Sequence, residues 1–222
     1  MSNSNKLQLV SFKVCPFAQR AAIALQEKQV AYETEYLMPG EDQPDWFKQI
    51  SPLGKVPVLV VDGTPVFESA VILEYLDEVY APQLHPADPL AKARQRAWME
   101  VASELFGKQY MLVTAKDQAG FETAKQDLQA GLDRVASALS AEQPFFNGQS
   151  FALVDVAFAP LFVRLGILEK VFKLNFQSNP RIKAWSSALL GKDSVKNSVV
   201  SNFEEVFMMF VKKSDGYLVN HL

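Results

Sequence analysis

Hydrophobic and polar positions follow two different rhythms along the chain, and the change comes near residue 80. Before that point, short apolar runs alternate with stretches whose apolar residues recur at helical spacing, and after it only the helical spacing remains. The Asp62-Gly63 pair predicts a hairpin turn between the last two strands, and Ser69 is the expected N-cap of the helix that follows. The strands are predicted at 7–12, 31–37, 56–61 and 64–67, and the helices at 18–27, 45–50 and 70–79. This order, β-α-β-α-β-β-α, corresponds to a βαβ unit followed by a hairpin and a closing helix.

Prolines at positions 82, 86 and 89 interrupt the pattern and predict a linker. The expected organisation is an α/β domain at 1–80, the linker at 81–88 and an all-helical domain at 89–222. Pro89 suits the first turn of a helix, because a proline there loses no intrahelical hydrogen bond. The helices of the second domain are predicted at 90–114, 121–139, 154–169, 180–190 and 195–212.

Composition agrees with a folded chain of 222 residues. Hydrophobic residues make up 49% and charged residues 21% of it, which excludes a disordered chain. With 22 basic and 25 acidic residues the net charge is −3, so no overall field draws the protein to nucleic acid. Residues 1–80 carry 6 basic and 11 acidic side chains, a net charge of −5. An anionic ligand of the first domain must therefore be bound by local donors.

The apolar stretch 151–168 contains Asp155 and Arg164, so we interpret it as a buried helix of the second domain and not as a membrane span. The polar start of the chain lacks the apolar core of a signal peptide, which favours a cytoplasmic protein. The chain has two histidines, His85 and His221, and one cysteine, Cys15. A His/Cys-rich zinc site and an internal disulfide are therefore excluded, and we expect no metal.

Cys15 lies where the first strand is predicted to end and the first helix to begin. A thiolate there faces unpaired backbone N–H groups and the positive end of the helix dipole, which can lower a thiol pKa to roughly 3.5–7.5. Lys13 and Arg20 could add positive charge, and the alternative is an inert core cysteine. Ala18 occupies the position of the second cysteine in a Cys-x-x-Cys motif, so the second thiol must come from solution. Glutathione is the abundant candidate.

Three motifs in order along the chain resemble the thioredoxin-like half of a glutathione transferase, and a fourth resembles the central helix of the helical half. The Cys-Pro-Phe-Ala start is similar to the cysteine-type, omega-like branch of that family. The motifs lie at 15–20, 52–59, 68–72 and 145–160 within a likeness that covers about residues 7 to 190. The resemblance implies a thioredoxin-like α/β N-terminal domain, an all-α C-terminal domain, glutathione as co-substrate and a homodimer.

The resemblance also implies roles for individual residues. Cys15 would be catalytic, and Val56-Pro57 would be a cis peptide whose Val56 backbone pairs with glutathione; an ordinary trans proline is the alternative. Glu68 would pair with the γ-glutamyl ammonium and Ser69 with its carboxylate, unless they are only a solvated charge and an N-cap. The remaining expected glutathione contacts are Phe17, and Gln43 with Lys55 at the glycyl carboxylate.

A second substrate would lie between the domains, against aromatic residues of the helix that Pro89 begins. The candidates are Trp98, Phe106 and Tyr110, although aromatic residues at helical spacing are often core. The central helix lacks half of the usual capping box, because Ala152 precedes Asp155 by three residues where the family has Ser or Thr.

The implied activity is that of a glutathione-dependent thioltransferase similar to dehydroascorbate reductases, which works through a Cys15–glutathione mixed disulfide on a small electrophilic or disulfide substrate. Two alternatives remain. Proteins similar to the stringent-starvation regulators share the fold and bind RNA polymerase, but typically lack the reactive thiol. Proteins similar to the chloride intracellular channels insert into membranes, which the charged residues of 151–168 disfavour. We expect neither a nucleic-acid nor a membrane partner.

Overall fold

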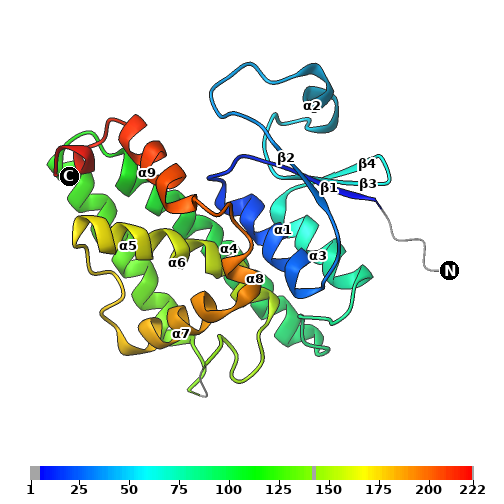
Figure 1. Ribbon diagram of the computed structural model, residues 1–222. Coiled ribbons are helices and arrows are strands. Elements are labelled where there is room, and N and C mark those ends of the chain that lie inside the picture. Colours follow the sequence, from blue (N-terminus) through cyan, green and yellow to red (C-terminus); the bar gives the residue numbers. More distant parts are fainter. Residues whose placement is uncertain (1–5, 142–143, 222) are drawn as a thin grey trace.

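The computed structural model describes residues 6–141 and 144–221 and has an α/β part and a helical part (Figure 1). The α/β part consists of β1 (Leu7–Ser11), α1 (Pro16–Glu27), β2 (Glu33–Tyr36), α2 (Asp45–Ile50), β3 (Val58–Val61), β4 (Thr64–Phe67) and α3 (Ser69–Val79). The helical part consists of α4 (Pro89–Thr114), α5 (Gln118–Ala138), α6 (Leu153–Phe172), α7 (Pro180–Gly191), α8 (Asp193–Lys196), α9 (Phe203–Lys213) and the 3-10 helix η1 (Tyr217–His221). The predicted order of strands and helices in the first part is confirmed.

The four strands form one sheet in the order β2-β1-β3-β4, in which β1 is parallel to β2 and antiparallel to β3. Successive side chains of a strand point to opposite faces. Leu7 and Leu9 of β1 therefore join the main core on the face covered by α1 and α3, whereas Val10 joins a smaller core on the α2 face. In Figure 1, α1 and α3 lie between the sheet and the helical part. This is the thioredoxin-like arrangement that the resemblance implied.

The central helix α6 is buried along most of its length and packs against α1, α4 and α7. Its first turn is held by Asp155, whose carboxylate accepts hydrogen bonds from the amides of Ala152 and Phe146 at 2.9 Å and from Trp185 Nε1 at 2.7 Å. Burial raises the pKa of Asp155 to about 6 although these three bonds oppose the rise. The carboxylate thus supplies its half of the capping box through Ala152. It also holds the loop at Phe146 and the helix α7 at Trp185. Within the described ranges, no helix is both long and apolar enough to cross a membrane.

Two expectations about helix ends are corrected by the structure. The stretch predicted as one helix at 195–212 is divided into α8 and α9, with Val199, Val200 and Asn202 between them. β-Branched residues and asparagine have low helix propensity, which explains the break. Ser69 is the first residue of α3 and not its N-cap, because Glu68 takes that place with φ of 68°.

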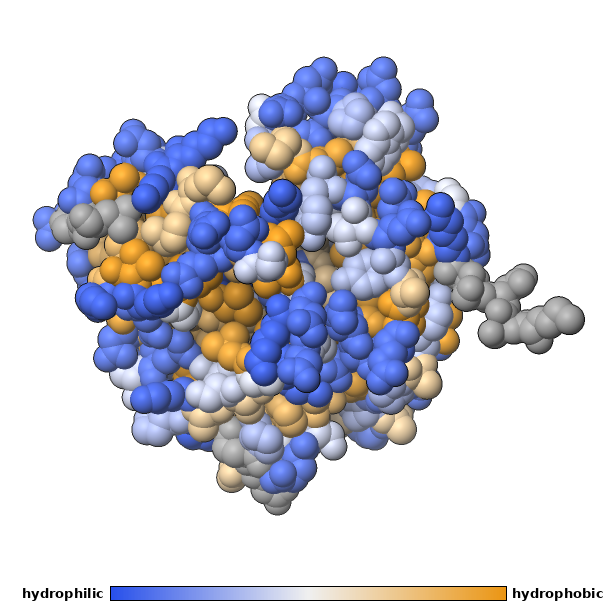
Figure 2. Space-filling view, in the orientation of Figure 1, coloured by the Kyte–Doolittle hydropathy of each residue, from blue (hydrophilic) through white to orange (hydrophobic). Residues whose placement is uncertain are grey.

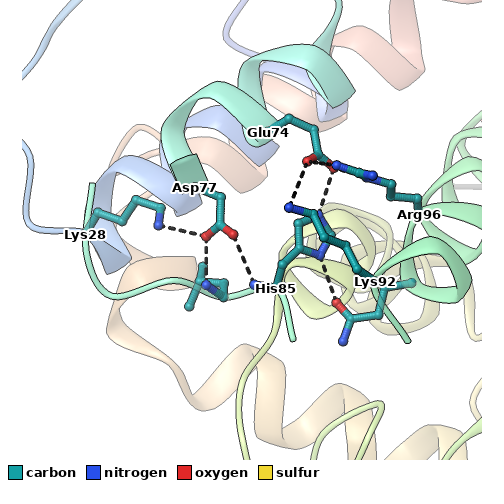
Figure 3. Close-up of polar contacts among 8 residues, drawn as sticks. Lys28, Glu74, Asp77, His85, Lys92 and Arg96 are labelled. Carbon is teal, nitrogen blue, oxygen red and sulfur yellow. Dashed lines mark hydrogen bonds and ion pairs between the residues drawn. The ribbon is translucent and has the colours of Figure 1, made fainter. Parts of the chain in front are cut away.

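A buried ion pair holds the segment that joins the two parts (Figure 3). Lys28 Nζ donates to Asp77 Oδ1 at 2.9 Å and to the carbonyls of Tyr80 and Pro82 at 2.8 and 2.7 Å. The same carboxylate accepts the amides of Leu84 and His85. Because the ammonium group makes three hydrogen bonds, its removal from water is compensated. We call Lys28, Asp77, Glu74, His85 and Arg96 the linker clasp.

The rest of the linker clasp connects α3 to α4. Glu74 receives Arg96 Nη2 at 2.6 Å and lies 2.8 Å from His85 Nε2, whose Nδ1 faces Gln95 Oε1 at 3.2 Å (Figure 3). Burial acts to raise the pKa of Glu74, but hydrogen bonds from Arg96 and His85 outweigh it and lower the pKa to about 2. A carboxyl pKa below its unfolded value means that this contact stabilises the fold at neutral pH. The stabilisation is lost as the pH falls from about 4 toward 2.

We predict that Lys28→Met lowers the free energy of unfolding by about 3–5 kcal/mol, because Asp77 is then a buried charge without its cation. Chemical denaturation measures the loss. Lys48→Met is the matched control, since its pairs with Asp42 and Asp45 are exposed and such pairs contribute about 0–1 kcal/mol. Equal effects of the two substitutions would contradict the prediction.

Candidate functional site

Cys15 lies between β1 and α1, as the sequence predicted. It is the N-cap of α1, with Pro16 at the first helical position, and its amide donates to the Phe12 carbonyl at 3.0 Å. Its Sγ lies 3.9 Å from the carbonyl oxygen of Val56, which belongs to the loop before β3. The thiol is thus placed where α1 begins and where the backbone before Pro57 passes.

The pKa of the Cys15 thiol corrects the expectation of a low value. Burial raises this pKa above its ordinary value, while the amides of Ala18 and Phe17 and the charges of Arg164 and Arg20 act to lower it. Helix placement alone therefore does not decide the state of the thiol, because desolvation opposes its ionisation although Cys15 is only half-buried. The unliganded protein holds a neutral thiol at neutral pH, with positive charge placed nearby.

The first of the two positive charges, Arg164 of α6, is 3% exposed. Its Nη2 donates to the carbonyl of Val14, the residue before Cys15, at 3.0 Å, and its Nη1 donates to Gln19 Oε1 at 2.6 Å. The ring of Phe203 lies 5.0 Å from the guanidinium, and burial lowers the pKa of Arg164 to about 9. From the sequence, Arg164 was noted only as a charge that disfavours a membrane span. A basic residue inside an otherwise apolar stretch was the signal that could have identified it.

The second charge, Arg20 of α1, is fully buried. It donates to Ser103 Oγ at 2.9 Å, to the carbonyls of Ala157 and Met99, and at 3.4 Å to Ser69 Oγ. Burial lowers the pKa of Arg20 to about 9 as well. Among the described residues, neither guanidinium has a carboxylate within ion-pair distance, and only the charge of Glu100 acts on Arg20 from farther away. The region between the two parts therefore holds two buried cations that form no ion pair.

The Val56-Pro57 peptide is cis, as predicted. A cavity of about 170 Å³ opens beside it. We call it the cis-proline cavity. Its lining residues are Phe17, Ser51, Leu53, Lys55, Val56, Pro57, Phe67, Glu68 and Ser69. Six of the seven residues expected to contact glutathione are among them, whereas Ser51, Leu53 and Phe67 were not expected there. Gln43 is not among them, because its amide donates to the carbonyls of Met38 and Glu41 in its own exposed loop.

Glu68 and Ser69 lie together at the start of α3, at one end of this cavity. Glu68 adopts a positive φ of 68°, which non-glycine residues rarely adopt and which is frequent at functional sites. Ser69 begins the helix, so its amide and hydroxyl face the region where a helix favours negative charge. A carboxylate at Ser69 would meet the positive end of the α3 dipole, and an ammonium at Glu68 would meet the Glu68 carboxylate. Arg20 donates to Ser69 Oγ, which adds a cation near the same point.

A second cavity, of about 190 Å³, lies on the other side of Cys15, against β2. We call it the β2 cavity. It is lined by Leu9, Ser11, Phe12, Lys13, Cys15, Ala18, Gln19, Ala22, Tyr32, Thr34, Tyr36, Asn197, Ser198 and Val199. In Figure 2, the surface is hollowed between the α9 side and the α2 side, with hydrophobic residues on the floor of the hollow.

The three aromatic candidates for a second-substrate pocket line neither of these cavities. Trp98 packs on Phe146 at 5.6 Å, and buried Phe106 packs edge-on against Phe17 at 5.1 Å. Tyr110 is exposed and lies 6.3 Å from the Phe210 ring of α9. No cluster of three or more His, Cys, Asp or Glu side chains in the described part of the chain could hold a metal.

Comparison with known proteins gives matches over both parts of the chain. The family model for the glutathione S-transferase N-terminal domain matches residues 14–79, and that for the glutathione S-transferase C-terminal domain matches residues 94–193. Glutathione S-transferase omega-1 of Sus scrofa is 30% identical over 194 residues, which cover 85% of this chain and 78% of the relative. Glutathione S-transferase DHAR2 of Arabidopsis thaliana is 33% identical over 189 residues, 83% of each chain.

Solved structures agree with these sequence matches. Rice GST1 in complex with glutathione superposes with a TM-score of 0.85 and 28% identity, covering 96% of this chain and 98% of that one. Glutathione transferase Omega 3C from Trametes versicolor has a TM-score of 0.78 and 27% identity, covering 89% and 90%. The chain therefore belongs to the glutathione S-transferase family, in its omega-like branch.

Proposed function

We propose that this protein is a glutathione-dependent thioltransferase that works through a mixed disulfide between Cys15 and glutathione. The observation that carries the proposal is the position of the thiol: Cys15 Sγ lies 3.9 Å from the Val56 carbonyl, and Val56 lines the cis-proline cavity together with Glu68 and Ser69. A glutathione bound in this cavity would bring its sulfur to the only cysteine of the chain. Solved relatives with bound glutathione support this ligand.

The reaction needs two exchanges at one sulfur. The Cys15 thiolate attacks the glutathione sulfur of a glutathionylated substrate, the substrate disulfide breaks, and the substrate thiolate leaves and takes a proton from solvent. The thiolate of a second glutathione then attacks the mixed disulfide, which releases oxidised glutathione and restores the Cys15 thiolate. Ala18 stands where a resolving cysteine would be, so the second step depends on glutathione from solution.

The contacts to glutathione follow from the cis-proline cavity. Glu68 receives the γ-glutamyl ammonium, and the Ser69 amide and hydroxyl receive the neighbouring carboxylate at the start of α3. The Val56 backbone pairs with the extended peptide as an added strand would. Lys55 is the one cation among the residues that line this cavity and would pair with the glycyl carboxylate, and Phe17 contributes an apolar side to the cavity. Gln43 takes no part, since its amide is used within its own loop.

When the Cys15 thiol ionises, the nearby guanidinium groups of Arg164 and Arg20 offset part of the cost of burying the thiolate. The thiol is neutral at rest because burial raises its pKa, and Arg164 with Arg20 stabilises the charge that forms. A cytoplasmic location suits this chemistry, since glutathione and a lone free thiol both belong to a reducing compartment.

We predict that incubation with oxidised glutathione adds one glutathione to the intact protein and that a reductant removes it, as measured by mass spectrometry. Cys15→Ala abolishes the adduct and lowers thiol transfer by on the order of 10³-fold or more, because no other thiol can form the intermediate. Glu68→Ala is the comparison: it raises KM for glutathione while the adduct still forms. Thiol transfer by Cys15→Ala at the unmodified rate would refute the covalent mechanism.

We predict that Arg164→Met raises the pKa of Cys15 further, because a nearby buried cation that acts to lower this pKa is lost. The pH dependence of thiol alkylation reports this pKa, and the unmodified protein should already titrate above the usual cysteine value of about 8.5. Less thiolate is then present at neutral pH, so adduct formation slows. Arg164→Lys keeps the charge and should shift the profile less. An unchanged profile for Arg164→Met would exclude the electrostatic role.

We infer that the protein is a homodimer. Large apolar side chains stay exposed along β4, α3 and the start of α4, namely Phe67, Val71, Val79 and Leu90. Burying them in a partner surface would remove their apolar area from water. Light scattering at micromolar concentration should give about twice the chain mass of 24.8 kDa, and Leu90→Glu should shift the mass toward one chain. A mass of one chain for the unmodified protein would contradict the inference.

A further inference from the structure

The β2 cavity and the cis-proline cavity lie on opposite sides of Cys15. The strand order is β2-β1-β3-β4, and Cys15 follows β1 in the middle of the sheet. The cis-proline cavity is built at β3, β4 and the start of α3, whereas the β2 cavity is built from β1, β2, α1 and residues 197–199. Cys15 lines the second cavity directly and meets the first through Val56. One sulfur therefore lines one binding space and lies 3.9 Å from a residue that lines the other.

The lining of the β2 cavity is polar and rich in hydrogen-bond donors. It contains no acidic side chain, and its one cation is Lys13, whose ammonium lies 5.8 Å from the centre of the Tyr36 ring. Two of these side chains are already paired: Gln19 Nε2 donates to Ser198 Oγ at 3.0 Å, and Gln19 Oε1 accepts from Arg164 Nη1 at 2.6 Å. The side chains of Thr34 and Asn197 make no hydrogen bond to the described chain. These groups are available to a ligand that accepts hydrogen bonds.

The face of β2 that meets this cavity is fixed by the sheet register. Thr34 pairs with Leu9 and Tyr36 with Ser11, so both point to the α1 face. Glu33 and Glu35 pair with Gln8 and Val10 and point to the opposite face. The alternation keeps the two carboxylates of this strand out of the cavity, although β2 as a whole is exposed. An anion in the cavity therefore meets Lys13 and hydroxyl groups and not the acidic side chains.

We propose that the β2 cavity is the subsite for the partner that exchanges with glutathione, and that it takes one half of a low-mass disulfide bearing a carboxylate. The proposal rests on the proposed function, since it needs Cys15 to be the nucleophile. The volume of about 190 Å³ suits a small group and is below the usual range of about 300–1,000 Å³ for drug-sized ligands. The donors and Lys13 select for a carboxylate over a neutral apolar group.

The placement of the two cavities fits a defined order of bond changes. The Cys15 thiolate attacks one sulfur of a disulfide RS–SR, one RS⁻ leaves and takes a proton from solvent, and the other half remains on Sγ in the β2 cavity. A glutathione thiolate in the cis-proline cavity then attacks Sγ, the bond between Sγ and SR breaks, and the second RS⁻ leaves on the side away from glutathione. A second glutathione thiolate releases oxidised glutathione. One disulfide and two glutathiones thus give two RSH and one oxidised glutathione.

The test compares two tryptophan substitutions on one strand. Thr34→Trp fills the β2 cavity from the α1 face, and Glu35→Trp, one residue on, places the same side chain on the opposite face. For each full-length variant, we measure the rate of Cys15 modification by 3,3′-dithiodipropionate and divide it by the rate with oxidised glutathione. Oxidised glutathione serves as the reference because its binding needs only the cis-proline cavity. We expect this ratio to fall by about tenfold or more in Thr34→Trp, because a filled pocket rejects its ligand sterically. In Glu35→Trp it should stay within about twofold.

Lys13→Ala tests the charge preference. The ratio of rates with 3,3′-dithiodipropionate and with neutral bis(2-hydroxyethyl) disulfide should fall about three- to fivefold, as expected for loss of one partly exposed ion pair. The subsite is overturned if Thr34→Trp leaves its ratio unchanged or if Glu35→Trp lowers it equally. An unchanged ratio in Lys13→Ala overturns the preference for a carboxylate.

A binding measurement separates this proposal from the proposed function. Calorimetric titration of Cys15→Ser with 3-mercaptopropionate should give binding that Thr34→Trp removes and Glu35→Trp keeps, with no reaction at residue 15. If the unmodified protein forms no glutathione adduct, the thioltransferase proposal fails and this titration still reports on the cavity. Absence of binding to Cys15→Ser overturns the subsite even where the glutathione adduct forms.

Discussion

The arrangement around Cys15 depends on two guanidinium groups buried between the α/β part and the helical part. Arg164 reaches from α6 to the carbonyl of Val14, and Arg20 reaches from α1 to α3, α4 and α6. Their hydrogen-bond partners are carbonyl, hydroxyl and amide oxygens, although Arg164 Nε has no partner among the described residues. The same contacts fix the turn that carries the thiol and keep positive charge beneath it.

These two buried cations bear on the charge balance of the α/β part. Its net charge of −5 opposes an anionic ligand at long range, yet the expected ligand brings carboxylates and a thiolate. Short-range donors decide the outcome, because charges act strongly over a few ångströms in a buried region and weakly through solvent. Arg20 donates to Ser69 Oγ and therefore lies near the carboxylate expected there. Arg164 donates to the carbonyl of Val14 and therefore lies near the expected Cys15 thiolate.

The linker clasp holds α4 against α3, next to the interface that contains the two guanidinium groups. Lys28 and Asp77 are almost completely removed from water and hold the chain between α3 and α4, while Glu74 joins α3 to Arg96 of α4. Every contact of Arg20 and Arg164 to the other part requires α6 and α4 to stay docked on α1. The linker and the surroundings of Cys15 therefore depend on the same interface.

Local features of the sequence determined the elements of the α/β part and the position of Cys15 at a strand end, because both depend on periodicity and on turn residues. The cis peptide before Pro57 and the grouping of Lys55, Val56, Glu68 and Ser69 were implied by the family resemblance and not by these residues alone. The tertiary structure alone decided the state of the thiol and the existence of the β2 cavity. Arg164 meets Val14 across 150 positions, and residues 197–199 close a cavity whose other walls come from the first 36 residues. Burial raises the pKa of Cys15, against the local effect of the helix end, because desolvation is set by every segment packed around a group and not by the residues next to it in the chain.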